Sequence, residues 1–213
     1  MLKLKEKYIQ HTKDSRISGL SSPVIGLTGG IATGKSTVSD YLKAQGHPVI
    51  CADQMVKRLY GKEETINFIQ KEFPGVCGPQ GIDFKKLREV FFHDSKAQSL
   101  IEGFLYPRLA LEVKTEFKSL GSPSYIFYDV PLLFEFYMAS GVDLRLLVYA
   151  PYEIQLKRLL ERDKISAELA QEILAKQWPI DQKLKLSDFV IKNEGAREEL
   201  PTEIEKILTE IFI

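Results

Sequence analysis

The sequence predicts an α/β fold in which helices cover both faces of a five-stranded parallel sheet. Five short apolar runs have the length and residue types of buried strands. Segments with apolar residues at helical spacing separate these runs, and strands that alternate with helices form parallel sheets through right-handed crossovers. In such sheets a ligand binds over the carboxyl ends of the strands. The five predicted strands are Val24–Leu27, Pro48–Ala52, Ser124–Leu133, Leu144–Ala150 and Ser187–Asn193.

A glycine-rich turn follows the first predicted strand, leads into a helical pattern and fits the phosphate-loop template G-x-x-x-x-G-K-[ST]. Glycines let successive backbone N–H groups approach phosphate oxygens, and the N-terminus of the following helix attracts the same charge. We expect Lys35 to reach the β- and γ-phosphates of a nucleotide, and the Ser36 hydroxyl to bind Mg²⁺. A turn that only joins a strand to a helix is the alternative, but the strand, loop and helix context favours nucleotide binding. The predicted nucleotide-binding residues here are Gly29, Gly30, Ile31, Ala32, Thr33, Gly34, Lys35, Ser36 and Thr37.

The composition predicts one domain with a smaller insertion. The chain has 213 residues, of which 44% are hydrophobic, so it can bury a sizeable core. Its 29 basic and 29 acidic residues cancel, and no global field would recruit nucleic acid or an anionic membrane. The longest apolar stretch, residues 125–142, contains Asp129 and Glu135, which argues against a membrane span. Two cysteines without metal-ligand spacing imply no disulfide framework and a cytoplasmic location.

Acidic residues close two of the predicted strands. Asp53 follows the second strand and Asp129 lies at the end of the third, where ligands and metals are bound in sheets of this kind. Each has a structural alternative: Asp53 as the N-cap of the next helix, and Asp129 as a turn residue. The positions alone leave these alternatives open.

Three further segments have distinct patterns. Residues 1–21 lack an apolar signal core and mix basic with acidic residues, which predicts a solvated helical or disordered arm. Residues 61–120 form an insertion of helices, in which Pro107 should break or kink the longest one. After Pro151 a basic helix begins, and its Arg158 and Arg162 share one face. A solvated face paired with neighbouring acids is the alternative for these arginines.

Several strings together resemble the dephospho-coenzyme A (dephospho-CoA) kinase family, from about Ser22 to the C-terminus. They are IGLTGGIATGKSTVSDYL, VICADQMVKRLY, FLYPRL, YDVPLLFE, QLKRLLERD and FVIKNEG, in this order. The resemblance implies a phosphate-loop nucleoside triphosphate hydrolase fold. It also implies that ATP, with Mg²⁺, phosphorylates the ribose 3′-hydroxyl of dephospho-CoA in the last step of coenzyme A biosynthesis. We expect a monomer or small homo-oligomer that binds neither nucleic acid nor a membrane.

Carried over by position, the resemblance assigns roles to parts of the chain. It implies a core of residues 22–60, 121–151 and 184–213, an acceptor-binding insertion at 61–120, and a lid at 152–183. Asp53 would act on the acceptor hydroxyl, and Arg158 and Arg162 would neutralise the transferring phosphoryl group when the lid closes. Asn193 and Gly195 would meet the adenine. The resemblance places Tyr106, Asp129, Pro131 and Leu132 on the acceptor side.

The chain also departs from the family pattern on the acceptor side. Cys51 stands where the family commonly has a first aspartate, Tyr106 replaces a histidine, and Phe84 replaces an arginine. Alternative functions are a nucleoside-monophosphate-type or other small-acceptor kinase, a nucleotide-sensing switch and a non-catalytic nucleotide-binding homologue.

Overall fold

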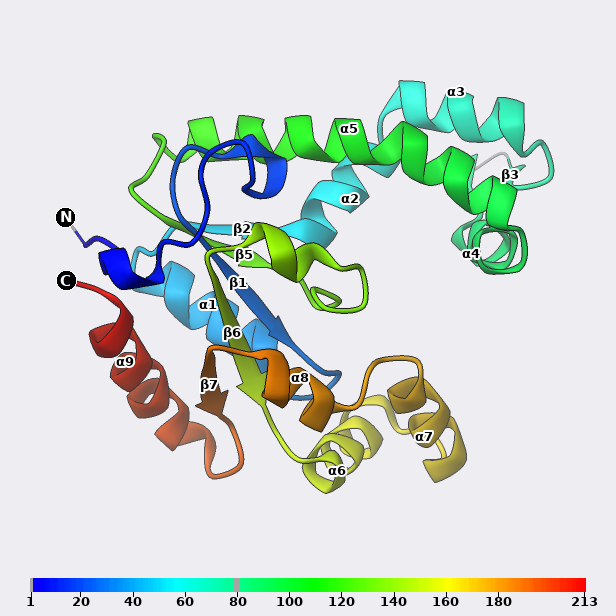
Figure 1. Ribbon diagram of the computed structural model, residues 1–213. Coiled ribbons are helices and arrows are strands. Elements are labelled where there is room, and N and C mark those ends of the chain that lie inside the picture. The colour runs from blue at the N-terminus through cyan, green and yellow to red at the C-terminus, as the bar shows by residue number, and fades with distance from the viewer. Residues whose placement is uncertain (1, 79–80) are drawn as a thin grey trace. The chain divides into compact units, whose positions relative to one another are not determined.

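The computed structural model describes residues 2–78 and 81–213, and its main sheet has five parallel strands (Figure 1). The strands are β1 (Val24–Gly29), β2 (Val49–Cys51), β5 (Ile126–Asp129), β6 (Leu144–Tyr149) and β7 (Phe189–Lys192). Their order is β2-β5-β1-β6-β7, so β1, which precedes the phosphate loop, is central. Leu27 of β1 is in register with Asp129 of β5, and Asp129 is also in register with Cys51 of β2. The predicted fold class is confirmed.

The chain divides into two compact units, which are described separately. The larger unit comprises the residues up to Cys51 together with Phe117–Ile213, and it contains the main sheet; the smaller unit is Ala52–Glu116. The larger unit also contains the helices α1 (Lys35–Ala44), α6 (Tyr152–Asp163), α7 (Ala167–Ala175), α8 (Ile180–Leu186) and α9 (Leu200–Ile211). Its 3-10 helices are η1 (Glu6–Tyr8), η2 (Ile17–Gly19), η3 (Met138–Gly141) and η4 (Arg197–Glu199).

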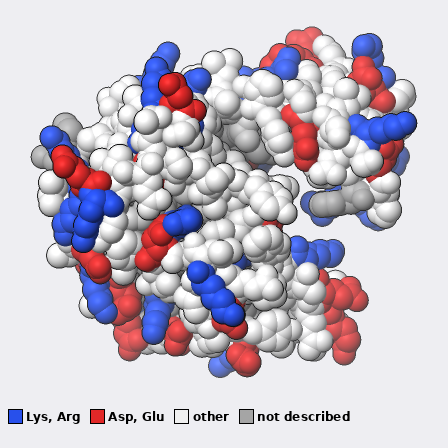
Figure 2. Space-filling model, in the orientation of Figure 1, with Lys and Arg blue, Asp and Glu red and all other residues white. Residues whose placement is uncertain are grey.

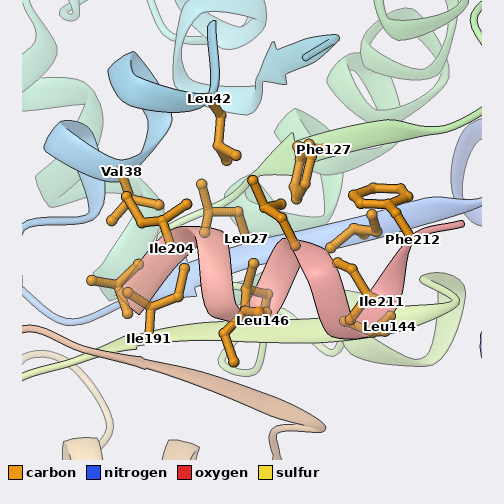
Figure 3. Close-up of a cluster of buried hydrophobic side chains, with 14 of the residues drawn as sticks. Leu27, Val38, Leu42, Phe127, Leu144, Leu146, Ile191, Ile204, Ile211 and Phe212 are labelled. Atoms are coloured by element: carbon orange, nitrogen blue, oxygen red, sulfur yellow. The ribbon is translucent and has the colours of Figure 1, made fainter. Parts of the chain in front are cut away.

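Helices α1 and α9 pack on the sheet around one buried cluster (Figure 3). The cluster contains Val38 and Leu42 of α1 and Ile204 of α9. These side chains are buried against every second residue of β1 and β6, including Leu27 and Leu146. The spacing of these apolar residues explains the packing, because four-residue steps share a helix face and two-residue steps share a sheet face. The core therefore fixes β1 and α1, the two elements that carry the phosphate loop.

The other face of the sheet is covered by the segment that follows β5. A side chain at Gly26 would lie 2.9 Å from Leu133 and 3.2 Å from Val142, so only a glycine lets this segment approach β1 so closely. Successive strand residues point to opposite faces of the sheet, and both kinds are fully buried, for example Leu146 and Leu147. A sheet buried on both faces explains why its strands are continuous apolar runs in the sequence.

The smaller unit is mainly helical and has its own core. Its elements are α2 (Ala52–Tyr60), α3 (Glu63–Glu72), β3 (Cys77–Gly78), β4 (Gly81–Ile82), α4 (Phe84–His93) and most of α5 (Ser95–Ser119). Ile69, Leu87 and Ile101 are buried together, and the Phe68 and Phe104 rings stack with centroids 3.9 Å apart. Strands β3 and β4 pair antiparallel. The sequence did not indicate this ribbon because two-residue strands have no measurable periodicity.

Of the break or kink expected at Pro107, the break is wrong, because α5 continues from Ser95 to Ser119 through the proline. A proline inside a helix removes one backbone donor and brings its ring against the carbonyl four residues earlier. That earlier residue is Gly103, around which there is open space, and buried Ile101 and Val113 anchor the helix on both sides of the proline. Packing therefore outweighs the local cost of the proline.

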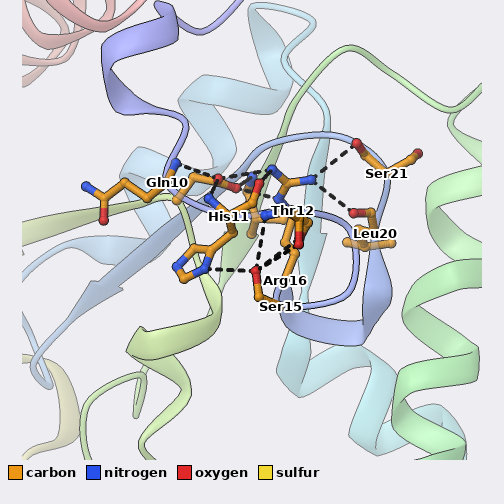
Figure 4. Close-up of polar contacts among 9 residues, drawn as sticks. Gln10, His11, Thr12, Ser15, Arg16, Leu20 and Ser21 are labelled. Carbon is orange, nitrogen blue, oxygen red and sulfur yellow. Dashed lines mark hydrogen bonds and ion pairs between the residues drawn. The ribbon is translucent and has the colours of Figure 1, made fainter.

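The N-terminal arm was expected to be solvated and helical, or disordered. Most of its residues are exposed and it contains η1 and η2, but it also packs on the larger unit, so the disordered alternative is wrong. Leu4 is buried and pairs antiparallel with Phe212, and the Lys3 amide donates to the Ile213 carbonyl over 3.1 Å. Arg16 is buried as well, and its guanidinium donates to carbonyl oxygens of the arm, as Figure 4 shows, and pairs with Asp143 at 2.6 Å. Asp143, Phe212 and Ile213 lie more than a hundred residues from their partners in the arm, so the local mixture of charges gave no sign of these contacts.

The surface carries mixed charge. On the face shown in Figure 2, basic and acidic side chains are interspersed, in keeping with the balanced composition. Within the described residues, no helix has both the length and the apolar character required to cross a bilayer.

Candidate active site

The phosphate loop, residues 29–36, connects β1 to α1, as predicted. Ala32 and Gly34 adopt positive φ angles of 60° and 91°, a region that glycine enters freely and alanine enters at some cost. A Cβ atom at Gly34 would also lie 2.2 Å from the Asn193 side-chain nitrogen. Both the backbone conformation and the neighbouring side chain therefore require glycine at position 34.

Side-chain donors hold the carbonyl groups of this loop. The Thr33 hydroxyl donates to the Gly30 carbonyl over 2.8 Å, and the Asn193 side-chain amide donates to the Thr33 carbonyl over 2.8 Å. Arg158 lies 3.5 Å from both the Ala32 carbonyl and the Asn193 side-chain oxygen. With these carbonyl oxygens engaged, and with the first amides of α1 lacking intrahelical partners, the loop presents N–H groups to an anion.

A lysine and an aspartate meet beside the loop. Lys35 is the first residue of α1, and its ammonium pairs with the carboxylate of Asp129 at the end of β5. The Asp129 side chain is 5% exposed and that of Lys35 is 15% exposed, so little water reaches this ion pair. Ser36 is exposed in the first turn of α1. The structure therefore pairs the predicted cation with the strand-end acid, and the predicted hydroxyl follows the cation in the same helical turn.

Asp53 lies two residues after Cys51, the last residue of β2. It is exposed and is the second residue of α2, so it lies inside the first helical turn and does not occupy the N-cap position. Tyr106, also exposed, lies on α5 of the same unit, and its pKa is raised to about 12 by burial of its hydroxyl and by Glu102. At neutral pH the Tyr106 hydroxyl is therefore protonated and can donate a hydrogen bond.

The remaining predicted site residues are Arg162, Asn193, Gly195, Pro131 and Leu132. The Arg162 side chain is 62% exposed and pairs with Asp163 at 2.6 Å. Asn193 is buried against the loop, and Gly195 is exposed beyond β7 with Glu199 close by. The Pro131 carbonyl accepts from the Thr28 hydroxyl over 3.1 Å, and Leu132 is half-buried next to it.

Three residues at the loop were not predicted. The Gln177 side-chain oxygen accepts a hydrogen bond from the Ile31 amide over 2.9 Å, and the Gln155 side chain packs against Gly30. Lys183 lies in the middle of α8 with its side chain fully buried. Burial lowers the pKa of Lys183, although the Glu135 carboxylate opposes this change. A buried lysine on a short amphipathic helix gives no local signal, because exposed lysines are far more common there.

Comparison with known proteins decides the family. A family model described as dephospho-CoA kinase matches residues 23–199. The chain belongs to the dephospho-CoA kinase family. The dephospho-CoA kinase of Fusobacterium nucleatum subsp. nucleatum is 37% identical over 193 residues, which are 88% of this chain and 97% of the relative. The protein is accordingly a kinase that uses ATP and acts on a small molecule.

Solved structures agree with this assignment. A dephospho-CoA kinase from Campylobacter jejuni has a TM-score of 0.61 and 30% identity, over 88% of this chain and 96% of that one. A crystal structure of a Thermus thermophilus protein has a TM-score of 0.79 and 28% identity, over 89% and 97% of the two chains. The family match begins at residue 23, so the N-terminal arm precedes the matched region of this chain.

Proposed function

We propose that the protein transfers the γ-phosphoryl group of ATP to the ribose 3′-hydroxyl of dephospho-CoA, yielding CoA and ADP. The observation that supports this proposal most is the phosphate loop with Lys35 paired to Asp129 on the adjacent strand, in a chain of this family. Such a site supplies a cradle of amides and one ammonium for a triphosphate.

ATP would bind through the loop amides and Lys35. The ammonium can turn from the Asp129 carboxylate to the β- and γ-phosphate oxygens, because these partners compete for the same cation. Mg²⁺ prefers oxygen ligands and is held largely by substrate phosphates. The Ser36 hydroxyl and the Asp129 carboxylate are oxygen donors of this kind on adjacent elements. When bound, Mg²⁺ would neutralise negative charge on the phosphates.

Asp53 would hold the acceptor hydroxyl in line with the γ-phosphorus. Phosphoryl transfer has a loose transition state, so orientation is most of the task and complete deprotonation is not required. The insertion at 61–120, with Tyr106, would bind dephospho-CoA, and Pro131 and Leu132 would border it. Arg158 is already at the loop, whereas Arg162 would arrive when the lid at 152–183 closes.

The cellular setting is part of the same proposal. We propose a cytoplasmic location, which suits the free cysteines Cys51 and Cys77, and a monomer or small homo-oligomer. Light scattering on the purified protein would measure the oligomeric state.

Coupled detection of ADP tests the proposed reaction. Purified protein with ATP and Mg²⁺ should release ADP with dephospho-CoA as acceptor, and much more slowly with AMP, CMP or shikimate. Preference for one of these other acceptors would assign the chain to another small-molecule kinase. Binding of ATP without turnover on any acceptor would indicate a non-catalytic homologue.

A further inference from the structure

Lys183 is a fully buried cation beneath the phosphate loop. Its ammonium donates to the Gly29 carbonyl over 3.3 Å and to the Pro131 carbonyl over 3.3 Å, and it pairs with Glu135 Oε1 at 2.6 Å. An ammonium has three N–H donors, and here each has an acceptor. The position of the ammonium is therefore fixed by two separate parts of the chain, the end of β1 and the segment of Pro131 and Glu135.

Two of these acceptors border the nucleotide site. Gly29 ends β1 and begins the phosphate loop, and Pro131 lies two residues after Asp129, the partner of Lys35. A carbonyl oxygen turned toward the cradle would repel phosphate oxygens, so a cation that engages the Gly29 carbonyl favours the conformation in which amides face the ligand. Lys183 thus contacts the loop through a carbonyl oxygen and not through the amides that would face the ligand.

Glu135 connects the same lysine to the end of the proposed lid. Its Oε1 atom also accepts a hydrogen bond from the Trp178 amide over 3.1 Å. The neighbouring Gln177 accepts from the Ile31 amide, so residues 177–183 contact the loop at both Gly29 and Ile31. The other carboxylate oxygen of Glu135 is buried and lacks a hydrogen-bond partner within the described part of the chain. A buried carboxylate oxygen without a hydrogen-bond partner lowers the stability of the fold, and an apolar side chain at this position would avoid that loss.

We propose that Lys183 is a positioning residue that, together with Glu135, holds the Gly29 end of the phosphate loop in its ATP-binding conformation. This inference rests on the proposed function for the identity of the ligand. Lys183 makes no contact with ATP; it acts through the Gly29 carbonyl and the segment that carries Pro131 and Glu135.

The test compares single and double variants by calorimetric titration with ATP. Lys183→Met keeps the length of the side chain and removes its donors, but it leaves the Glu135 carboxylate buried and unpaired, which should lower the melting temperature. Adding Glu135→Gln removes that charge and should restore the melting temperature. The double variant should still bind ATP about ten- to a hundredfold more weakly, the loss expected for one charge-assisted hydrogen bond.

Two controls complete the design. Lys185→Met alters an exposed lysine of the same helix and should bind ATP as the wild type does. Lys183→Arg keeps a charged donor and should recover part of the affinity. A double variant that is folded and binds ATP with wild-type affinity would overturn the inference. The titration omits the acceptor, so a wild-type protein that binds ATP but does not phosphorylate dephospho-CoA would contradict only the proposed reaction.

Discussion

Single residues divide into those that the local sequence identifies and those that only the fold reveals. Lys35 and Asp129 were predicted, because a loop motif and a strand end are local features, and the structure pairs them. Gln177 and Lys183 were missed because their partners Ile31 and Gly29 lie 146 and 154 positions away. Nothing in a single sequence records contacts of that separation.

Asp53 and Lys35 should fail differently when replaced. Asp53→Asn should lower kcat by about a hundredfold or more and change the dissociation constant for ATP by less than about threefold, because its role is on the acceptor. Lys35→Ala should weaken ATP binding as well as lower kcat. Steady-state ADP release and calorimetry measure the two effects. Asp40→Asn, an exposed acid on α1, is the control, and a near-normal kcat for the Asp53 variant would remove Asp53 from the mechanism.

Elements were predicted more reliably than the connections between them. The five strands were all identified, because buried parallel strands are continuous apolar runs. The ribbon of β3 and β4, the continuous α5 and the ordered arm were missed, since each depends on tertiary packing and not on local periodicity.

The arm should make stability depend on pH. Burial alone would raise the pKa of Asp143, but hydrogen bonds from Arg16 and from the Val24 and His11 amides outweigh burial and lower it below its ordinary value of 3.8. A carboxylate with a depressed folded pKa stabilises the fold above its unfolded pKa, and this contribution is lost as the pH falls through the folded pKa. The stabilisation should therefore be complete near neutral pH and disappear below pH 3.8.

Asp143→Asn should abolish this part of the acid sensitivity. Because it leaves buried Arg16 without its counter-ion, it should also lower the free energy of unfolding at neutral pH by about 3 kcal/mol. Urea titrations from neutral pH down to the acid limit measure both effects. Asp14→Asn, an exposed acid of the same arm, should change the unfolding free energy by less than about 0.5 kcal/mol. An Asp143 variant as stable and as acid-sensitive as the wild type would show that the buried pair does not hold the arm.

Helix α6 should contribute to turnover through Arg162. Its side chain is exposed and paired with Asp163, and we propose that its contact with the phosphoryl group forms when the lid closes. Arg162→Ala should lower kcat about tenfold to a hundredfold while changing ATP affinity much less. Lys157→Ala, an exposed cation on the same helix, is the matched control. An unchanged kcat would return Arg162 to the alternative of a solvated charged face.

At the scale of the whole molecule, the larger unit carries the phosphate loop. The smaller unit begins directly after β2, and Asp53 lies in its first helix, α2. The larger unit is built around a sheet whose central strand leads into the phosphate loop, and its core holds both β1 and α1. The smaller unit has a separate aromatic and aliphatic core. We propose that the two units supply the donor and acceptor sides of one reaction.

Analysis of the reaction product tests this account most directly. Wild-type protein is incubated with ATP, Mg²⁺ and dephospho-CoA, and the acceptor is then examined by mass spectrometry and phosphorus NMR. The account predicts that one phosphoryl group is transferred and appears as a ribose 3′-phosphate, at a rate that Asp53→Asn reduces strongly. ATP consumed while dephospho-CoA is recovered unchanged, or a phosphate found on a different hydroxyl, would contradict it.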